Sequence, residues 1–109
     1  MPKYIIERVI PASGALTSRS LQKMAQQSCD AIQQIGTKIQ WIESFVTADK
    51  WYCVYIADEE ETIRQHAQIG NFPIDAIHEV MAYVDPVSAE GNLTQRKKQQ
   101  SPGEPFPDC

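Results

Sequence analysis

Residues 39–57 read IQWIESFVTADKWYCVYIA, and this stretch decides the fold. Two segments rich in Ile, Val, Trp, Tyr and Phe, residues 39–47 and 51–56, flank the short connection Ala48-Asp49-Lys50. β-branched and aromatic residues favour strands, and a short connection between two such segments favours a hairpin. We therefore predict two neighbouring antiparallel strands in the middle of the chain.

A helix is expected on each side of this hairpin. The first begins near Thr17, a good N-cap residue, and ends at Gly36. Its apolar residues keep one face of a 3.6-residue period: Leu21, Met24, Ala25, Ile32 and Ile35. The second begins after Asp58, its expected N-cap, and stops near Gly70. The three glutamates that follow Asp58 suit the positive end of a helix dipole. Both helices should pack an apolar stripe against the sheet.

Two further strands, one before the first helix and one after the second, complete the domain. Residues 4–9 are rich in Ile, Val and Tyr and end before Pro11, and a fourth strand is expected over residues 76–84. The order βαββαβ is typical of the split β-α-β arrangement of ferredoxin-like domains. We therefore predict an α+β fold, a ferredoxin-like sandwich in which two helices cover one face of an antiparallel sheet. This domain covers residues 1–84.

The composition changes after Val84. Residues 85–109 hold four of the seven prolines, and residues 96–102 contain no hydrophobic side chain. Such a segment buries too little apolar surface to offset the entropy of ordering it. Residues 85–109 are therefore expected to form a Pro-rich polar tail, either flexible or docked on a neighbouring subunit through Phe106.

The face of the sheet that the helices leave open predicts the oligomeric state. Side chains alternate between the two faces of a strand. Assigning the more aliphatic sets to the helices leaves the aromatic sets on the open face: Trp41, Phe45, Trp51 and Tyr55. A soluble monomer rarely exposes so large an apolar patch. We therefore expect a two-fold symmetric homodimer that packs through the open sheet face.

Composition narrows the class of protein. The formal charge is −4 and the pI is about 5.0, which disfavours a nucleic-acid binder. No apolar run approaches the roughly 20 residues that cross a bilayer, and residues 1–8 do not resemble a secretion signal. The three cysteines have no CxxC spacing and are odd in number, unlike a secreted disulfide scaffold. We therefore expect a cytoplasmic protein with no nucleic-acid or membrane partner.

Side chains of the metal-ligating types are present, although no HxxxH or CxxC spacing fixes a site. The candidates, in order of preference, are His66, His78, Cys53, Glu43 and Glu7. Each has a simpler alternative: a packing histidine at His66, an exposed one at His78, a small core residue at Cys53. The two glutamates either form ion pairs at the rim or lie between subunits as ligands or general bases.

Several segments resemble a family of short bacterial proteins that is catalogued as a domain of unknown function. The similarity lies in Pro2–Arg8, in residues 39–47 and 50–57, in Ile63–Ala67, and in Gly70, Phe72 and Pro73. The characterised member of that family is described as nickel-binding. The resemblance implies a ferredoxin-like fold, a homodimer and nickel ions at the dimer surface, without an established enzymatic activity. The same ligand types would also accept zinc or copper.

Two other functions remain open at this stage. In the first, the paired open faces of a dimeric α/β barrel enclose a cavity for a small-molecule enzyme, with Glu43, Cys53 and Tyr55 projecting into it. In the second, the protein is an interaction module whose tail binds a partner. The sequence contains no GxSxG, Walker-type or GxGxxG motif that would favour a particular enzyme class.

Overall fold

The structure is a computed structural model that describes residues 1–91. Its elements follow one another in the predicted order, with two short 3-10 helices added. They are β1 (Lys3–Val9), η1 (Ser13–Ala15), α1 (Ser18–Ile35), β2 (Ile39–Val46), β3 (Lys50–Ala57), α2 (Glu60–Gly70), β4 (Ala76–Glu79) and η2 (Pro86–Glu90). The predicted tail lies largely outside the described residues, since only its first part, with η2, is included.

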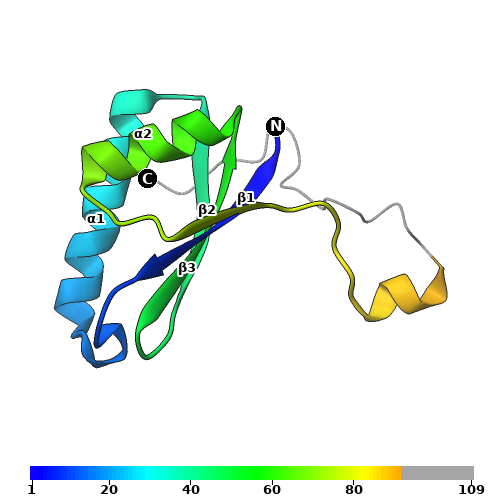
Figure 1. The fold of residues 1–109 in the computed structure, drawn as a ribbon, viewed down its shortest axis with the longest axis horizontal. Coiled ribbons are helices and arrows are strands. Elements are labelled where there is room, and N and C mark those ends of the chain that lie inside the picture. The colour runs from blue at the N-terminus through cyan, green and yellow to red at the C-terminus, as the bar shows by residue number, and fades with distance from the viewer. Residues whose placement is uncertain (92–109) are drawn as a thin grey trace.

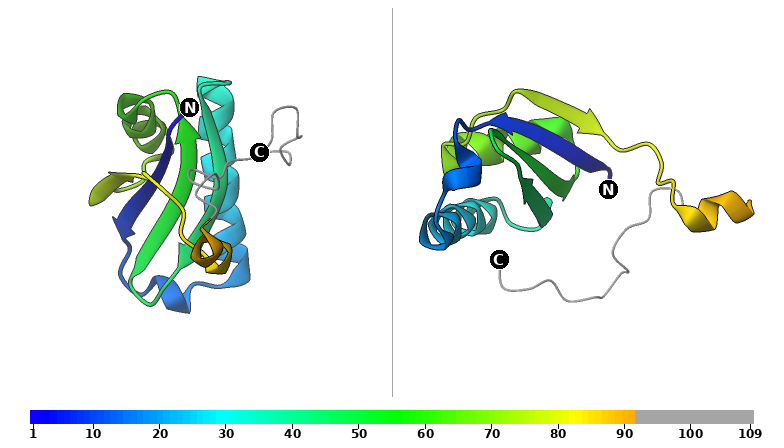
Figure 2. Two further views of the ribbon diagram at one scale, coloured as in Figure 1. Left: turned by 90° about the vertical axis from the view of Figure 1, so that its right-hand side faces the viewer. Right: turned by 90° about the horizontal axis from the view of Figure 1, so that it is seen from below.

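The four strands form one antiparallel sheet in the order β2-β3-β1-β4. Both helices lie on the same face of this sheet, and the other face is left uncovered (Figures 1 and 2). This α+β arrangement agrees with the predicted ferredoxin-like topology, in which the first and third strands occupy the centre. Residues 3–9 and 50–57 therefore run side by side although they are far apart in sequence.

Local sequence explains most of the element ends. Thr17 caps α1 by accepting a hydrogen bond from the Ser20 backbone N–H. Gly36 follows α1 with a φ of 92°, which favours glycine, although its ψ of −139° lies outside the expected left-handed helical region. The N-cap of α2 is Glu59 and not the predicted Asp58, whose carboxylate instead accepts hydrogen bonds from Glu59 N–H and the Thr62 hydroxyl.

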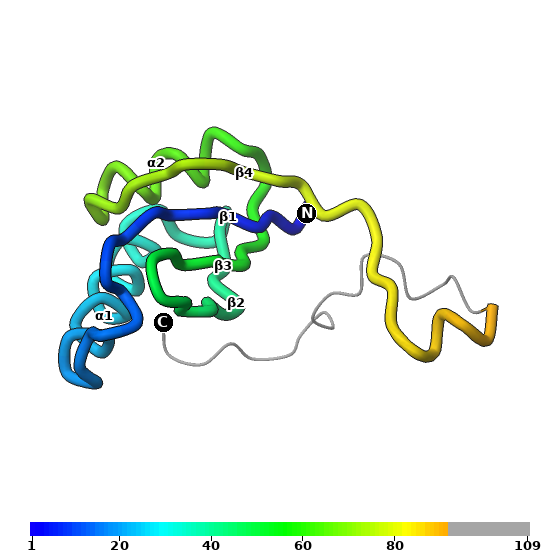
Figure 3. Tube along the Cα trace, turned by 60° about the horizontal axis from the view of Figure 1, so that its bottom comes forward, coloured from blue at the N-terminus to red at the C-terminus, as the bar shows by residue number. Residues whose placement is uncertain are grey.

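The fourth strand is shorter than predicted. β4 ends at Glu79, after pairing with β1 from Glu7 to Tyr4, because β1 itself begins at Lys3. Beyond Val80, whose N–H donates to the Lys3 carbonyl, the described part of the chain extends away from the sandwich and includes η2 (Figure 3). This arm, residues 80–91, exposes three apolar side chains: Met81, Val84 and Val87.

The core lies between the sheet and the two helices. Its buried members come from all these elements: Tyr4, Ile6, Ile32, Ile39, Trp51, Cys53, Tyr55, Ala57 and Ile63. Within residues 1–91, no helix is both long enough and apolar enough to traverse a lipid bilayer.

The predicted assignment of side chains to the two faces was wrong for β3. Trp51, Cys53 and Tyr55 are buried beneath the helices, whereas Val54 lies on the open face. Both sets of β3 are apolar, so alternation alone could not orient this strand.

In β2 the prediction failed for a different reason. The register shifts between Trp41 and Glu43, which pair with the consecutive residues Tyr55 and Val54 of β3. Such a bulge breaks strict alternation. Trp41 consequently packs against the core beneath the helices, whereas Phe45 remains 53% exposed on the open face, as expected.

Candidate functional site

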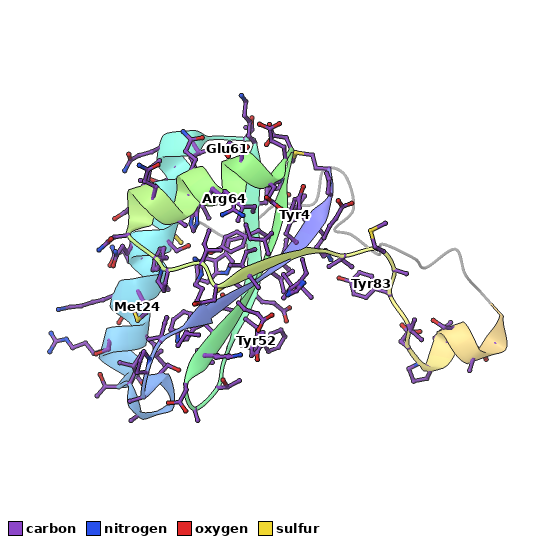
Figure 4. The ribbon with its side chains drawn as sticks, viewed as in Figure 1. Tyr4, Met24, Tyr52, Glu61, Arg64 and Tyr83 are labelled. Carbon is purple, nitrogen blue, oxygen red and sulfur yellow. The ribbon has the colours of Figure 1, made fainter. Side chains whose placement is uncertain are left out.

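The open face carries a pair of potential metal ligands, Glu7 of β1 and His78 of β4. His78 Nε2 donates a hydrogen bond of 2.8 Å to Glu7 Oε2. The Lys50 Nζ lies 3.5 Å from the other carboxylate oxygen, Oε1. Glu7 pairs with Tyr52 of β3 on one side and with Ala76 of β4 on the other, so the sheet register brings these side chains together. Figure 4 labels Tyr52 in this region.

Its neighbours stabilise the charged form of Glu7. The hydrogen bond from His78 is the main cause that lowers the pKa of Glu7, and the positive charge of Lys50 lowers it further. The His78 side chain is 59% exposed, so both groups are accessible to solutes. An ionised carboxylate beside an accessible imidazole supplies two side chains of the types that bind metal ions.

The helix-covered face carries a second polar cluster, which is buried. Ser28 Oγ of α1 lies 3.1 Å from His66 Nε2 of α2 and 3.4 Å from the Tyr55 hydroxyl of β3. The His66 ring also stacks on Phe72 at a centroid distance of 5.8 Å. Arg8 of β1 completes the cluster, since its guanidinium lies 5.2 Å from the Phe72 ring centroid.

Burial keeps this cluster nearly free of charge. Burial, assisted by the positive charge of Arg8, lowers the pKa of His66 to about 4, so that its imidazole is neutral at pH 7. Burial raises the pKa of Tyr55 to about 12, so its hydroxyl keeps its proton. Arg8 is then the one group of this cluster that carries a charge.

The predicted candidate ligands fall into two groups on opposite faces. Glu7 and His78 contact each other on the open face, and Glu43 lies on that face too, on the far edge strand β2. His66 and Cys53 are buried on the helix-covered face. Among residues 1–91, no group of three or more His, Cys, Asp or Glu side chains is arranged to hold a metal ion.

The set proposed for the enzyme hypothesis is likewise divided by the sheet. Glu43 is exposed on the open face, whereas Cys53 and Tyr55 are buried beneath the helices. The expectation that these three side chains project toward one cavity was therefore wrong. It depended on the orientation of β3, which the sequence pattern did not determine.

Sequence reasoning missed Arg8, Ser28 and Lys50 as members of these sites. A signal for Ser28 was present, because it occupies the gap between Ala25 and Ile32 in the apolar stripe of α1. His66 similarly lies between Ile63 and Ala67 in the stripe of α2. A polar residue within an apolar stripe indicates a buried polar contact. Arg8 gave no such signal, since both sets of side chains in β1 are mixed.

Comparisons with known proteins agree with this fold. The model of a family described as "Nickel responsive protein SCO4226-like" matches residues 4–80. The crystal structure of SCO4226 from Streptomyces coelicolor A3(2) is similar, with a TM-score of 0.63 and 15% sequence identity. That match covers 75% of this chain and 99% of the other, and at this identity it shows a shared fold. No curated protein matches. Since the family model covers most of the chain, the protein belongs to the SCO4226-like family of nickel responsive proteins.

Proposed function

We propose that this protein binds nickel through Glu7 and His78 on the open face of the sheet, and that it does so as a homodimer. The observation that carries the proposal is the 2.8 Å contact between His78 Nε2 and Glu7 Oε2. Imidazole and carboxylate are both ligands that Ni(II) accepts. The family suggests the metal, and this contact supports the choice of ligands.

Binding requires a change in protonation at His78. Its Nε2 carries a proton while it donates to Glu7, and a metal ligand needs that lone pair free. With the ring proton on Nδ1 instead, Nε2 would be free for the metal, which would lie between the two side chains while Lys50 moves away from the carboxylate.

Two protein ligands fall short of the four or more that a tetragonal nickel site uses. Water can fill the other positions, and so can a second copy of the chain. A two-fold dimer that packs through the open face would bring a second Glu7–His78 pair to the same interface. This is why the dimer forms part of the proposal.

The apolar character of the open face supports such a dimer. A groove of about 380 Å³ crosses this face, lined by residues of the sheet and of the arm. Its lining includes Ile5, Ile42, Phe45, Val54, Val80 and Val84. Val84 is 86% exposed and Phe45 is 53% exposed, so an apolar surface continues from the sheet onto the arm. A second copy of the chain offers a complementary surface of the same kind.

Calorimetric titration of the untagged full chain with Ni(II) tests the metal site. Glu7→Gln and His78→Gln should each weaken binding by at least about tenfold, since each removes one ligand. Glu79→Gln is the matched control, because it changes an exposed carboxylate on the same strand and should leave binding unchanged. The proposal fails if the double variant binds nickel as tightly as the original chain, or if binding is weaker than about 1 mM.

Sedimentation of the same preparations tests the dimer. Val54→Glu places a charge in the apolar groove and should convert the dimer to a monomer. Glu61→Gln, on the exposed surface of α2, should leave the dimer intact. An unsubstituted chain that sediments as a monomer would contradict the dimer. The metal site on a single chain would then be tested by the titration alone.

A further inference from the structure

The guanidinium of Arg8 is buried on the helix-covered face. Arg8 as a whole is 1% exposed, and its Nη1 donates a hydrogen bond of 2.7 Å to the Pro73 carbonyl. Nη2 is also buried, and it has no hydrogen-bond partner within residues 1–91. Aromatic rings of Phe72 and Tyr55 lie 5.2 Å and 6.0 Å away and supply contact without neutralising the charge.

No carboxylate compensates this charge in the part of the chain that the structure describes. The ion pairs found there, Lys50–Glu7, Arg64–Glu60 and His78–Glu7, involve exposed or half-exposed side chains. The nearest titratable neighbours of Arg8, His66 and Tyr55, are both neutral at pH 7. A buried cation without a counter-charge is strongly unfavourable, so its retention calls for an explanation.

A small cavity adjoins this guanidinium. It measures about 10 Å³, close to the lower limit for one water-sized guest. Its lining contains one cation, several neutral donors and no carboxylate: Arg8, Met24, Ser28, Trp41, Ser44, Trp51, Cys53, Tyr55 and Phe72. The indole Nε1 of Trp51 is a second buried donor without a partner. Two unsatisfied N–H donors thus belong to side chains that border the same space.

We propose that this cavity is a binding site for a small monovalent anion, held by Arg8 Nη2–H and Trp51 Nε1–H. An anion would neutralise the guanidinium and satisfy both donors at once, whereas a water molecule would satisfy the donors alone. The cavity is close to the size of one water molecule, which favours a single-atom anion such as a halide and disfavours sulfate or phosphate. Met24, a flexible side chain on α1, lines the cavity and can adjust to the guest (Figure 4).

Bromide is a suitable probe because it quenches indole fluorescence on contact and scatters X-rays anomalously. The unmodified chain has two tryptophans, Trp41 and Trp51, and the side chains of both border the cavity. Their fluorescence should fall along a saturable curve as bromide replaces gluconate at constant ionic strength. Collisional quenching without a site would give a linear curve instead, and that result would overturn the proposal.

Arg8 is then tested in the same titration. Arg8→Met keeps the length of the side chain and removes the charge, and it should abolish the saturable phase. Arg64→Met is the matched control, because Arg64 is exposed on α2, and it should keep that phase. Saturable quenching that survives in Arg8→Met would assign the anion to another site and contradict the proposal.

Crystals of the full chain grown in bromide decide the matter if Arg8→Met fails to fold. The expected result is an anomalous peak between the Arg8 guanidinium and the Trp51 indole. An ordered water at that position in the presence of saturating bromide, or an empty cavity, would overturn the assignment. Neither outcome depends on the nickel proposal, which concerns the opposite face of the sheet.

Discussion

The two histidines lie on opposite faces of the sheet, in surroundings that differ in burial and charge. His66 is 0% exposed beneath the helices, where burial and Arg8 keep it neutral, whereas the His78 side chain is 59% exposed and bonded to an ionised carboxylate. The first is neutral and enclosed, and the second is accessible to solutes. The difference teaches that the surroundings set by the fold, and not the residue type, decide which histidine is available for chemistry.

The largest expected effect concerns packing on the covered face. Ile6→Ala removes a fully buried side chain from β1 and should lower the free energy of unfolding by about 2–5 kcal/mol. Val9→Ala, three residues along the same strand and exposed, should cost no more than about 0.5 kcal/mol. Urea denaturation of both variants measures the contrast. Equal losses would mean that the two positions are not distinguished by burial as described.

The next prediction uses acid to test the neutral state of the buried His66. Burial lowers the pKa of His66 from 6.5 to about 4. Between pH 6.5 and pH 4, the unfolded chain therefore binds a proton at this residue and the folded chain does not. Stability should therefore fall by about 3 kcal/mol as the pH drops from 6.5 to 4. His66→Gln should flatten this slope. Stability measured from pH 7 to pH 4.5 gives most of the effect.

The carboxylates affect the free energy of unfolding in a lower pH range than His66 does, so the two contributions can be distinguished. The pKa values of Glu7 and Asp58 are lowered from 4.5 and 3.8, so stability from these groups is lost only as the pH falls below those values. A wild-type chain whose stability is constant between pH 6.5 and 4.5 would contradict the buried, neutral state of His66.

A smaller effect is expected at the end of α2. A Cβ added at Gly70 would overlap the ring of Phe72, which stacks on His66 and contacts Arg8. Gly70→Ala should therefore displace the ring and cost about 1–3 kcal/mol. Phe72→Leu combined with Gly70→Ala should recover part of that loss, since the smaller side chain relieves the overlap. Thermal unfolding of the single and double variants measures this; additive losses would rule out the contact.

The smallest expected effect returns to the open face. Lys50 lies 3.5 Å from the Glu7 carboxylate and repels an incoming cation. Lys50→Gln should strengthen nickel binding by about two- to fivefold. Lys23→Gln, on the exposed surface of α1, is the control for a change of net charge alone. Equal effects in the two variants would mean that Lys50 does not compete with nickel for Glu7.

The sequence allowed the element order to be predicted because each element carries its own local signal. Thr17 and Gly36 mark the ends of α1, and the hairpin of β2 and β3 shows strand composition on both sides of a short connection. The assignment of side chains to the two faces of the sheet was harder to predict, because Trp51, Cys53 and Tyr55 alternate with residues that are equally apolar. The bulge at Trp41 and Glu43 also has no local signature in this sequence.

The candidate site was predictable as a set of residue types but not as an arrangement. Glu7 and His78 are 71 residues apart, and only the pairing of β1 with β4 brings them within 2.8 Å. Cys53 and His66 are also of metal-ligating types, yet the orientation of β3 and the stripe of α2 bury them on the other face. Register and orientation are properties of the whole sheet, and no short motif encodes them here.

One measurement tests the central claim most directly: the anomalous difference map of nickel-grown crystals at the nickel absorption edge. The account predicts a peak at coordination distance, about 2.0–2.2 Å, from His78 Nε2 and from a Glu7 carboxylate oxygen. A strong peak beside His66 and Cys53 beneath the helices, with none near His78, would contradict it.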